Sequence, residues 1–258
     1  MLIHDCRLKA LFPTLVFFSS AVPMSSQHQP IPRRIMQMGP PSRAAWAAKY
    51  NSSYGSWQRY HPGWRHDLLA AGLGDNPSLQ RLVSRTVPQF LPTWRKLCYG
   101  IMQIDIARVV WLLAHGGIYA DLDTEALRHA APFLENASIV LVANHTQHAR
   151  ETGCMLRKPL CGTHMSNAFM AGVPGHPFWW ELLSYTTRHV DEVCAKKENL
   201  VHRVPELTGP FAVGRTYERF VKAHPRLARG IRVLPRQPPL FLGKSEAGWL
   251  KKQPVKLN

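Results

Sequence analysis

Acidic side chains gather in one apolar segment of this otherwise basic chain. Of its sixteen acidic residues, four (Asp105, Asp121, Asp123 and Glu125) lie within 21 positions, whereas Lys and Arg total thirty-two. Asp121 and Asp123 are two residues apart, so on an extended chain they point the same way while Leu122 points into the core. Two carboxylates on one face can hold a hard divalent cation, Mn²⁺ or Mg²⁺, which neutralises a leaving diphosphate.

The elements around these carboxylates follow from local patterns. Residues 101–113 are apolar on all sides of a helical wheel, which predicts a buried helix. Asp105 and Arg108 share one face of it. A buried charge is costly unless it is paired or faces a polar site, so we expect both to serve the site; a structural ion pair is the alternative. Residues 115–117 (His-Gly-Gly) end the helix, and residues 118–120 (Ile-Tyr-Ala) have strand character.

The remaining elements alternate between strands and helices. With 258 residues and 45% apolar composition, we expect one α/β domain with a mostly parallel sheet flanked by helices. Ligands of such sheets lie at the carboxyl ends of the strands, where Asp121 and Asp123 fall. The predicted segments are strands at 35–38, 139–143 and 231–234, helices at 41–50, 178–195 and 210–223, and an irregular stretch at 81–100.

The central block resembles a known family. Asp105-Ile-Ala-Arg108 and Gly116-Gly-Ile-Tyr119-Ala-Asp121-Leu-Asp123 are similar to the glycosyltransferases with the DXD sugar-binding region, a family 32-like group. That group contains fungal initiating α-1,6-mannosyltransferases and inositol-phosphoceramide mannosyltransferases. The resemblance covers about residues 31 to 215. Its supporting matches are Ile31-Pro-Arg-Arg-Ile35, Trp57, His61-Pro-Gly63, Asn167-Ala-Phe-Met-Ala171, His176-Pro-Phe178 and Thr208-Gly-Pro210.

The resemblance implies a GT-A-like nucleotide-sugar-binding fold. It also implies metal-dependent, retaining transfer of a hexose, with mannose favoured, to a lipid or glycan acceptor. GDP-mannose is the favoured donor and a UDP-hexose the alternative. Asp121 and Asp123 would hold Mn²⁺ or Mg²⁺. The residues implied to be catalytic are Asp105, Arg108, Asp121 and Asp123. The residues implied to bind the donor are Asp105, Arg108, Tyr119, Asp121, Asn167 and Trp249.

Several residues have a second interpretation. Asn167 precedes an apolar run and could cap a strand, and Trp249, the expected lid residue, could be a core or surface tryptophan. We expect Glu125 to be a solvated residue or a helix start, and His176 to begin a helix. Thr208 with Gly209 and Pro210 is typical of a loop that opens a helix.

The N-terminal segment is typical of the secretory pathway. Arg7 and Lys9 precede the apolar residues 10–18, and Ser19-Ser-Ala21 is a cleavage candidate. Residues 1–24 are therefore predicted to be a signal peptide or a short signal-anchor, because the run falls short of the ~20 residues of a spanning helix. Residues 25–258 would form the catalytic domain, in the Golgi lumen or at its membrane.

The cysteines fit an oxidising compartment. Apart from Cys6, an even number remains, which suits disulfides, with free buried thiols as the alternative. Cys154 and Cys161 could close a local loop. The four are Cys98, Cys154, Cys161 and Cys194.

The net charge of +16 suits anionic partners, among them nucleotide-sugars, acidic glycans, the headgroups of a membrane and nucleic acid. Because the cations are spread along the chain, we favour a diffuse basic surface. No basic run with interleaved aromatics is present, so we expect no nucleic acid partner. One alternative is a nuclease that uses Asp123-Thr-Glu125 as a D-x-E motif, but it needs further aspartates and only Asp191 follows. The other is a non-catalytic, degenerate transferase, because Met36 and Gly39 replace a His and a Trp of the family pattern, and only Gly248-Trp249 of its C-terminal motif remains.

Overall fold

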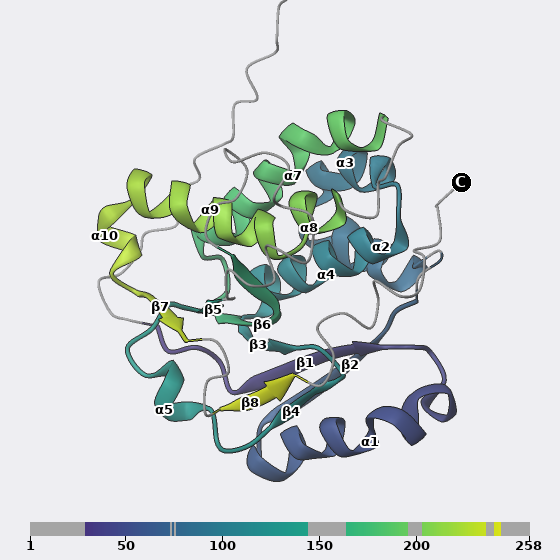
Figure 1. Ribbon diagram of the computed structural model, residues 1–258, viewed down its shortest axis with the longest axis vertical. Coiled ribbons are helices and arrows are strands. Elements are labelled where there is room, and N and C mark those ends of the chain that lie inside the picture. Colours follow the sequence, from purple (N-terminus) through teal and green to yellow (C-terminus); the bar gives the residue numbers. More distant parts are fainter. Residues whose placement is uncertain are drawn as a thin grey trace, which may run out of the picture.

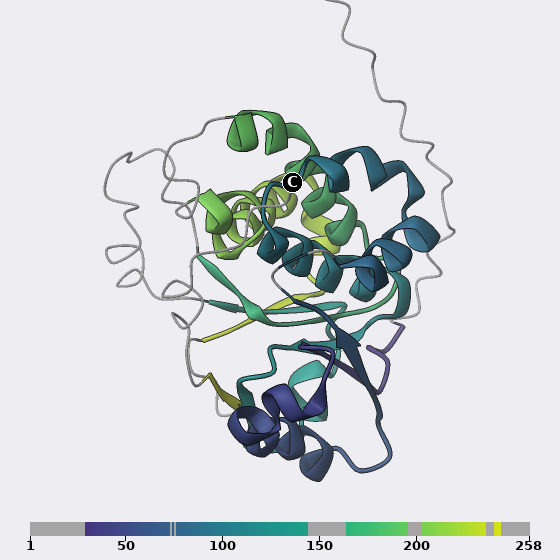
Figure 2. The same ribbon diagram turned by 90° about the vertical axis from the view of Figure 1, so that its right-hand side faces the viewer.

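A six-stranded sheet lies between two layers of helices (Figures 1 and 2). The computed structural model describes residues 29–72, 74, 76–143, 164–195, 203–235 and 240–243. The sheet order is β2-β1-β3-β6-β5-β7. Its strands are β1 (Arg34–Gly39), β2 (Arg65–Ala70), β3 (Gly117–Ala120), β5 (Ile139–Ala143), β6 (Met165–Gly172) and β7 (Ile231–Leu234).

The sheet is mostly parallel, as predicted. The pairs β1–β2, β1–β3 and β5–β7 run parallel, while β6 runs antiparallel to both β3 and β5. Because β6 is reversed, its first residues lie beside the end of β3. The N–H of Asp121 accordingly donates to the carbonyl of Ala168 at 2.8 Å. This arrangement places the start of β6 next to the D-x-D motif, and the predicted α/β fold class is confirmed.

Most helices cover one face of the sheet (Figure 1). On this face Met36, Tyr119 and Met170 of the strands pack in one hydrophobic core with helical residues. The helices are α2 (Pro77–Thr86), a 3₁₀ turn η1 (Pro88–Phe90), α3 (Leu91–Lys96), α4 (Gly100–His115), α7 (Pro177–Ala195), α8 (Val204–Leu207), α9 (Pro210–Ala223) and α10 (Pro225–Ala228).

A thinner layer covers the opposite face (Figure 2). It contains α1 (Arg43–Tyr60), α5 (Ala131–Leu134) and a two-stranded antiparallel ribbon of β4 (Thr124–Ala126) and β8 (Phe241–Gly243). Its core is formed by Ile35, Ile118 and Phe169 of the sheet with Trp57 of α1. Because consecutive strand residues point to opposite faces, the sheet contributes to two separate cores, and the D-x-D motif lies where β3 passes into the second layer.

Helix α4 runs directly into β3. Its twelve buried residues include Asp105 and Arg108, which confirms the predicted buried helix. Gly116 follows with φ of 61°, and an added Cβ there would lie 2.9 Å from the carbonyl oxygen of Gly172. Only glycine suits this position, since it needs both a left-handed backbone and close approach to β6.

The predicted strands at 35–38, 139–143 and 231–234 and the helices at 178–195 and 210–223 are confirmed within one residue at each end. Two predictions need correction. The first helix does not end at Tyr50 but continues to Tyr60. Residues 81–100 are not irregular: they contain most of α2, η1, α3 and the first residue of α4, because prolines 77, 88 and 92 occupy first-turn positions that favour helix starts.

Two smaller predictions can also be compared with the structure. His176 begins α7, as expected: its Nδ1 accepts a hydrogen bond from the N–H of Phe178 at 3.1 Å. Glu125 is half-buried in strand β4, so no helix starts there.

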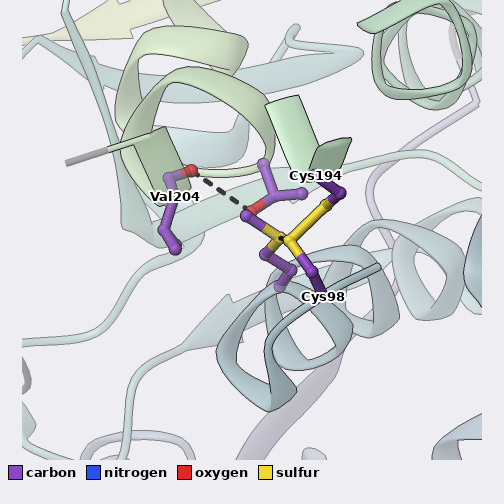
Figure 3. The surroundings of a disulfide bond; sticks show 5 residues. Cys98, Cys194 and Val204 are labelled. Carbon is purple, nitrogen blue, oxygen red and sulfur yellow. Dashed lines mark hydrogen bonds between the residues drawn. A yellow bond between two sulfur atoms is a disulfide. The ribbon is translucent and has the colours of Figure 1, made fainter. Parts of the chain in front are cut away.

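A disulfide joins two segments of the helical layer. It links Cys98, just before α4, to Cys194 in the last turn of α7, with Val204 of α8 beside it (Figure 3). This pairing could not be read from the sequence, and Cys154 and Cys161 lie outside the described residues. Across the ranges given above, no helix is both long and apolar enough to cross a membrane.

Candidate active site

Arg108 connects three separate parts of the chain at the end of β3. Its Nη2 lies 2.9 Å from Asp105 Oδ1 on the same helix, and its Nη1 lies 3.2 Å from Asp121 Oδ1 after β3. The same Nη1 donates to the backbone oxygen of Asn167 in β6 at 2.6 Å. The structure therefore brings together four of the residues that the sequence selected, Asp105, Arg108, Asp121 and Asn167.

Asp105 is a buried carboxylate with donors on both oxygens. Its side chain is 5% exposed. Besides the ion pair with Arg108, Oδ1 accepts from Asn167 Nδ2 at 3.0 Å and Oδ2 accepts from Thr208 Oγ1 at 2.8 Å. Burial raises the pKa of Asp105 to about 6, although Arg108 and Thr208 lower it. The group is thus positioned to change charge near neutral pH.

Tyr119 completes the surroundings of Arg108. The guanidinium lies over the phenol ring, 4.5 Å from its centroid, which is a favourable cation–π distance. Tyr119 Oη donates a short hydrogen bond to Asp121 Oδ1. Burial raises the pKa of Tyr119 above its ordinary value, so the phenol keeps its proton and acts as a donor to Asp121.

The D-x-D motif forms a turn rather than an extended strand. The N–H of Thr124 donates to the carbonyl of Asp121 at 3.0 Å, as in a β-turn. The prediction of an extended chain through the two aspartates is therefore wrong, although Leu122 is buried as expected. Asp121 is 32% exposed. Burial, followed by the charge of Asp121, raises the pKa of Asp123 to about 6.

Helix α1 holds this turn from the opposite layer. Ser53 Oγ donates to the carbonyl of Leu122 at 2.8 Å, and Trp57 Nε1 donates to the carbonyl of Thr124 at 2.7 Å. Ser56 Oγ accepts from the N–H of Ala126 at 2.8 Å. These bonds involve the part of α1 that the sequence did not predict to be helical.

Strand β1 also supports the turn. Gln37 Nε2 donates to the carbonyl of Asp121 at 3.1 Å. At Gly39 an added Cβ would lie 2.7 Å from Leu122 Cδ2. A larger side chain at residue 39 would therefore need Leu122 to move.

Sequence reasoning gave no role to five residues that support the site. No local signal marks Gln37, Ser53 or Ser56, because their partners lie far away in sequence. Trp57 and Thr208 did appear among the supporting matches, without a role.

The donor set suits a hard cation. Asp121 and Asp123 supply carboxylate oxygens from one turn, and Mg²⁺-type sites need only one or two protein carboxylates when water and phosphate complete the shell. In the described part of the chain no group of three or more His, Cys, Asp or Glu side chains could hold a metal. Trp249, the expected lid residue, lies outside the described residues.

Comparison with known families agrees with these motifs. Residues 48–140 match the family model described as a glycosyltransferase sugar-binding region containing the DXD motif. This stretch includes the D-x-x-R helix, the D-x-D turn and the half of α1 that holds the turn. The resemblance expected from the sequence is confirmed.

Similar curated proteins come from two yeasts. A Saccharomyces cerevisiae protein described as a glycosyltransferase, HOC1, is 30% identical over 140 residues, which are 50% of this chain and 33% of that protein. Inositol phosphoceramide mannosyltransferase 1 of Schizosaccharomyces pombe is 24% identical over 52% of this chain and 37% of its own. The initiation-specific α-1,6-mannosyltransferase of the same yeast is 26% identical over 62% and 40%. The chain spans between a third and two fifths of these relatives.

Two solved structures are partly similar to this chain at low sequence identity. PaToxG glycosyltransferase is 14% identical with a TM-score of 0.49 and covers 76% of this chain and 71% of its own. Mouse xyloside xylosyltransferase 1 is 12% identical with a TM-score of 0.41 and covers 78% and 84%.

Proposed function

We propose that this chain, which carries the sugar-binding region of DXD glycosyltransferases, transfers a hexose from a nucleotide-sugar to a glycan or lipid acceptor with retention of configuration. The observation that supports this proposal most directly is the contact of Arg108 with Asp121. Asp105 and Asn167 hold Arg108 in this position. The contact places a fixed positive charge beside the two carboxylates that suit a divalent ion. Mannose is the favoured sugar, because two of the similar yeast proteins are mannosyltransferases by name.

Asp121 and Asp123 would hold Mn²⁺ or Mg²⁺. Such an ion would neutralise the charge that develops on the leaving nucleoside diphosphate. Asp121 is partly exposed, which leaves room for phosphate oxygens. Tyr119 and Arg108 both bind Asp121 Oδ1 and so orient the other oxygen of this carboxylate.

Arg108 would stabilise the same leaving group. Its guanidinium is 5% exposed and held on three sides by acceptors. Its Nε is buried and has no hydrogen-bond partner in the described part of the chain. Preorganised charge of this kind, aimed where negative charge develops, is a large contribution to catalysis in many enzymes.

The proposed location is the secretory pathway, in the Golgi lumen or at its membrane. The Cys98–Cys194 disulfide supports this proposal, since structural disulfides persist mainly in oxidising compartments. In this scheme residues 1–24 direct or anchor the chain and residues 25–258 form the catalytic domain.

Donor turnover tests the proposal. The purified chain would be incubated with GDP-mannose, UDP-galactose, UDP-glucose and UDP-N-acetylglucosamine, each with Mn²⁺ and with a chelator. We expect turnover of one donor, GDP-mannose first, that stops when the metal is removed. Donor binding without turnover would favour the non-catalytic interpretation. If the chain neither bound nor turned over any donor, the proposal would be contradicted.

A further inference from the structure

We propose that Thr208 is a positioning residue of the active site: its hydroxyl holds Asp105 in place, and Asp105 in turn holds Arg108. The proposal rests on the transferase function above and gives a role to a residue that the sequence marked only as part of a supporting match. Thr208 Oγ1 donates to Asp105 Oδ2 at 2.8 Å across 103 positions of sequence, and Thr208 is 2% exposed.

The hydrogen bond fixes the orientation of the carboxylate. Asp105 Oδ1 receives Arg108 Nη2 and Asn167 Nδ2, so Thr208 is the donor on the other oxygen. With donors on both oxygens the carboxylate cannot rotate without breaking one set of bonds. Loss of the hydroxyl would leave a buried anionic oxygen with its donor removed, which is costly in a dry environment.

The Thr208 hydroxyl has a second acceptor within reach, and the distances decide between the two. The carbonyl of Val204 lies 3.3 Å from Oγ1, whereas Asp105 Oδ2 lies 2.8 Å away. A hydroxyl has a single proton, and bonds to ionised acceptors are shorter and stronger than those to neutral ones. The proton therefore belongs to the bond with Asp105.

Helix α7 holds the short helix that presents Thr208. Tyr185 Oη donates to the carbonyl of Glu206 at 3.0 Å, and Thr186 Oγ1 donates to the carbonyl of Leu207 at 3.2 Å. The N–H of Thr208 donates to the carbonyl of Val204 at 3.1 Å. The packing of α8 on α7 thus fixes the backbone of Thr208, and this places its hydroxyl against Asp105.

The disulfide connects this arrangement to the helix of Asp105. Cys194 lies in the last turn of α7, and its partner Cys98 lies two residues before α4. Figure 3 shows Val204 of α8 beside the bond between the two sulfur atoms. The disulfide therefore ties α7, on which α8 and Thr208 are held, to the segment that leads into the helix of Asp105.

The chain supplies a matched control in Thr216. This residue lies on α9, is 2% exposed, and its Oγ1 has no hydrogen-bond partner among the described residues. Replacing Thr216 by Val removes a buried hydroxyl without breaking a bond. Replacing Thr208 by Val removes the same atoms and the bond to Asp105, so the difference between the two variants reports that bond.

The kinetic test compares Thr208→Val, Thr208→Ser and Thr216→Val with the wild-type chain on the donor that the wild type turns over. We expect Thr208→Val to lower kcat by about tenfold or more with little change in KM, because Arg108 acts on charge that develops in the transition state. Thr208→Ser should recover most of kcat, and Thr216→Val should match the wild type. Normal kcat in Thr208→Val, no recovery in Thr208→Ser, or an equal loss in Thr216→Val would overturn the proposal.

A stability measurement separates this proposal from the transferase assignment. Denaturant midpoints would be compared for Thr208→Val alone and in an Asp105→Asn background. If the bond is charge-assisted, Thr208→Val should shift the midpoint clearly less in the Asp105→Asn background than in the wild type. Equal shifts in the two backgrounds would overturn the contact, whatever the activity of the variants. A wild-type chain that turns over no donor would contradict the transferase function and the catalytic part of this proposal, while the midpoints would still report the contact.

Discussion

Arg108 Nη1 lies 3.2 Å from Asp121 Oδ1, thirteen residues away across the Gly-Gly turn. This contact joins the buried helix α4 to the D-x-D turn. Since Arg108 also pairs with Asp105 and bonds the carbonyl of Asn167, one guanidinium sets the relative position of α4, the turn and β6. The site therefore depends on the planar, multidentate geometry of arginine and not only on its charge.

Replacing Arg108 by Lys tests this geometry. Lysine keeps the charge but cannot reach Asp105, Asp121 and Asn167 at once. We expect kcat/KM for the donor to fall by about 10²-fold, the scale of losing one preorganised donor in an active site. Arg232→Lys is the control, because Arg232 bonds backbone carbonyls of α5 and the residue after it. Activity close to wild type in Arg108→Lys would contradict the role of the guanidinium.

Replacing Ser53 by Ala tests how α1 supports the turn. Ser53 is fully buried and bonds the carbonyl of Leu122, so its removal leaves a buried acceptor without that donor. We expect the free energy of unfolding to fall by about 1–3 kcal/mol and the affinity for Mn²⁺ to weaken. Ser84→Ala is the control, since the bond of Ser84 to Arg81 is exposed. Equal effects of the two changes in chemical denaturation would count against this support.

Acid should inactivate the site at mildly low pH. Burial raises the pKa of both Asp105 and Asp123 to about 6. The ion pair with Arg108 and the binding of a cation both need the ionised carboxylates, so donor turnover should decline as the pH falls through about 6. A pH–rate profile and Mn²⁺ titrations at several pH values measure this, and activity that is flat down to about pH 4.5 would contradict it.

The same raised pKa values should affect stability in the direction opposite to activity: stability should be higher at low pH. A carboxyl whose folded pKa exceeds its unfolded value binds protons more tightly in the folded chain. The metal-free protein should therefore lose stability as the pH rises from about 4 to about 6. Thermal unfolding with chelator over this range would show the slope, and Asp105→Asn should reduce it. A slope unchanged by Asp105→Asn would mean that Asp105 does not titrate within this pH range.

The disulfide should contribute substantially to stability. Cys98 and Cys194 are 96 positions apart, and closing a loop of this size restricts the unfolded chain strongly. We expect the Cys98→Ser/Cys194→Ser double variant to lose about 2–4 kcal/mol of unfolding free energy. Chemical denaturation of wild type with and without reductant should show a loss of the same size. If reductant left the stability of the wild-type chain unchanged, the two sulfur atoms would not be bonded in solution.

The part of the site that local patterns encode could be predicted. The mostly apolar residues of α4 indicated a buried helix, and the Gly-Gly turn placed β3 and the D-x-D motif after it. Proline misled the interpretation of residues 81–100, because it interrupts a pattern yet favours the first turn of a helix. Strand β2 was missed because Arg65, His66 and Asp67 leave no apolar run.

The part of the site that depends on distant contacts could not be predicted. Ser53 reaches Leu122 across 69 positions, and Thr208 reaches Asp105 across 103. Ser53 has no local feature that marks it, and the Thr208-Gly-Pro210 match gives no sign that the hydroxyl of Thr208 meets Asp105. The reversed direction of β6, which brings Asn167 to the end of β3, is a property of the sheet and not of one segment.

The most direct test of the account compares Asp121→Asn and Asp123→Asn with Asp191→Asn in metal-dependent donor turnover. Asp191 is a control of the same type, since it is exposed and paired only at the surface with Lys96. The account predicts that both D-x-D variants lose turnover and the affinity for Mn²⁺ while the Asp191 variant keeps both. Turnover near the wild-type rate in Asp121→Asn and Asp123→Asn would contradict a metal-dependent transferase site in this turn.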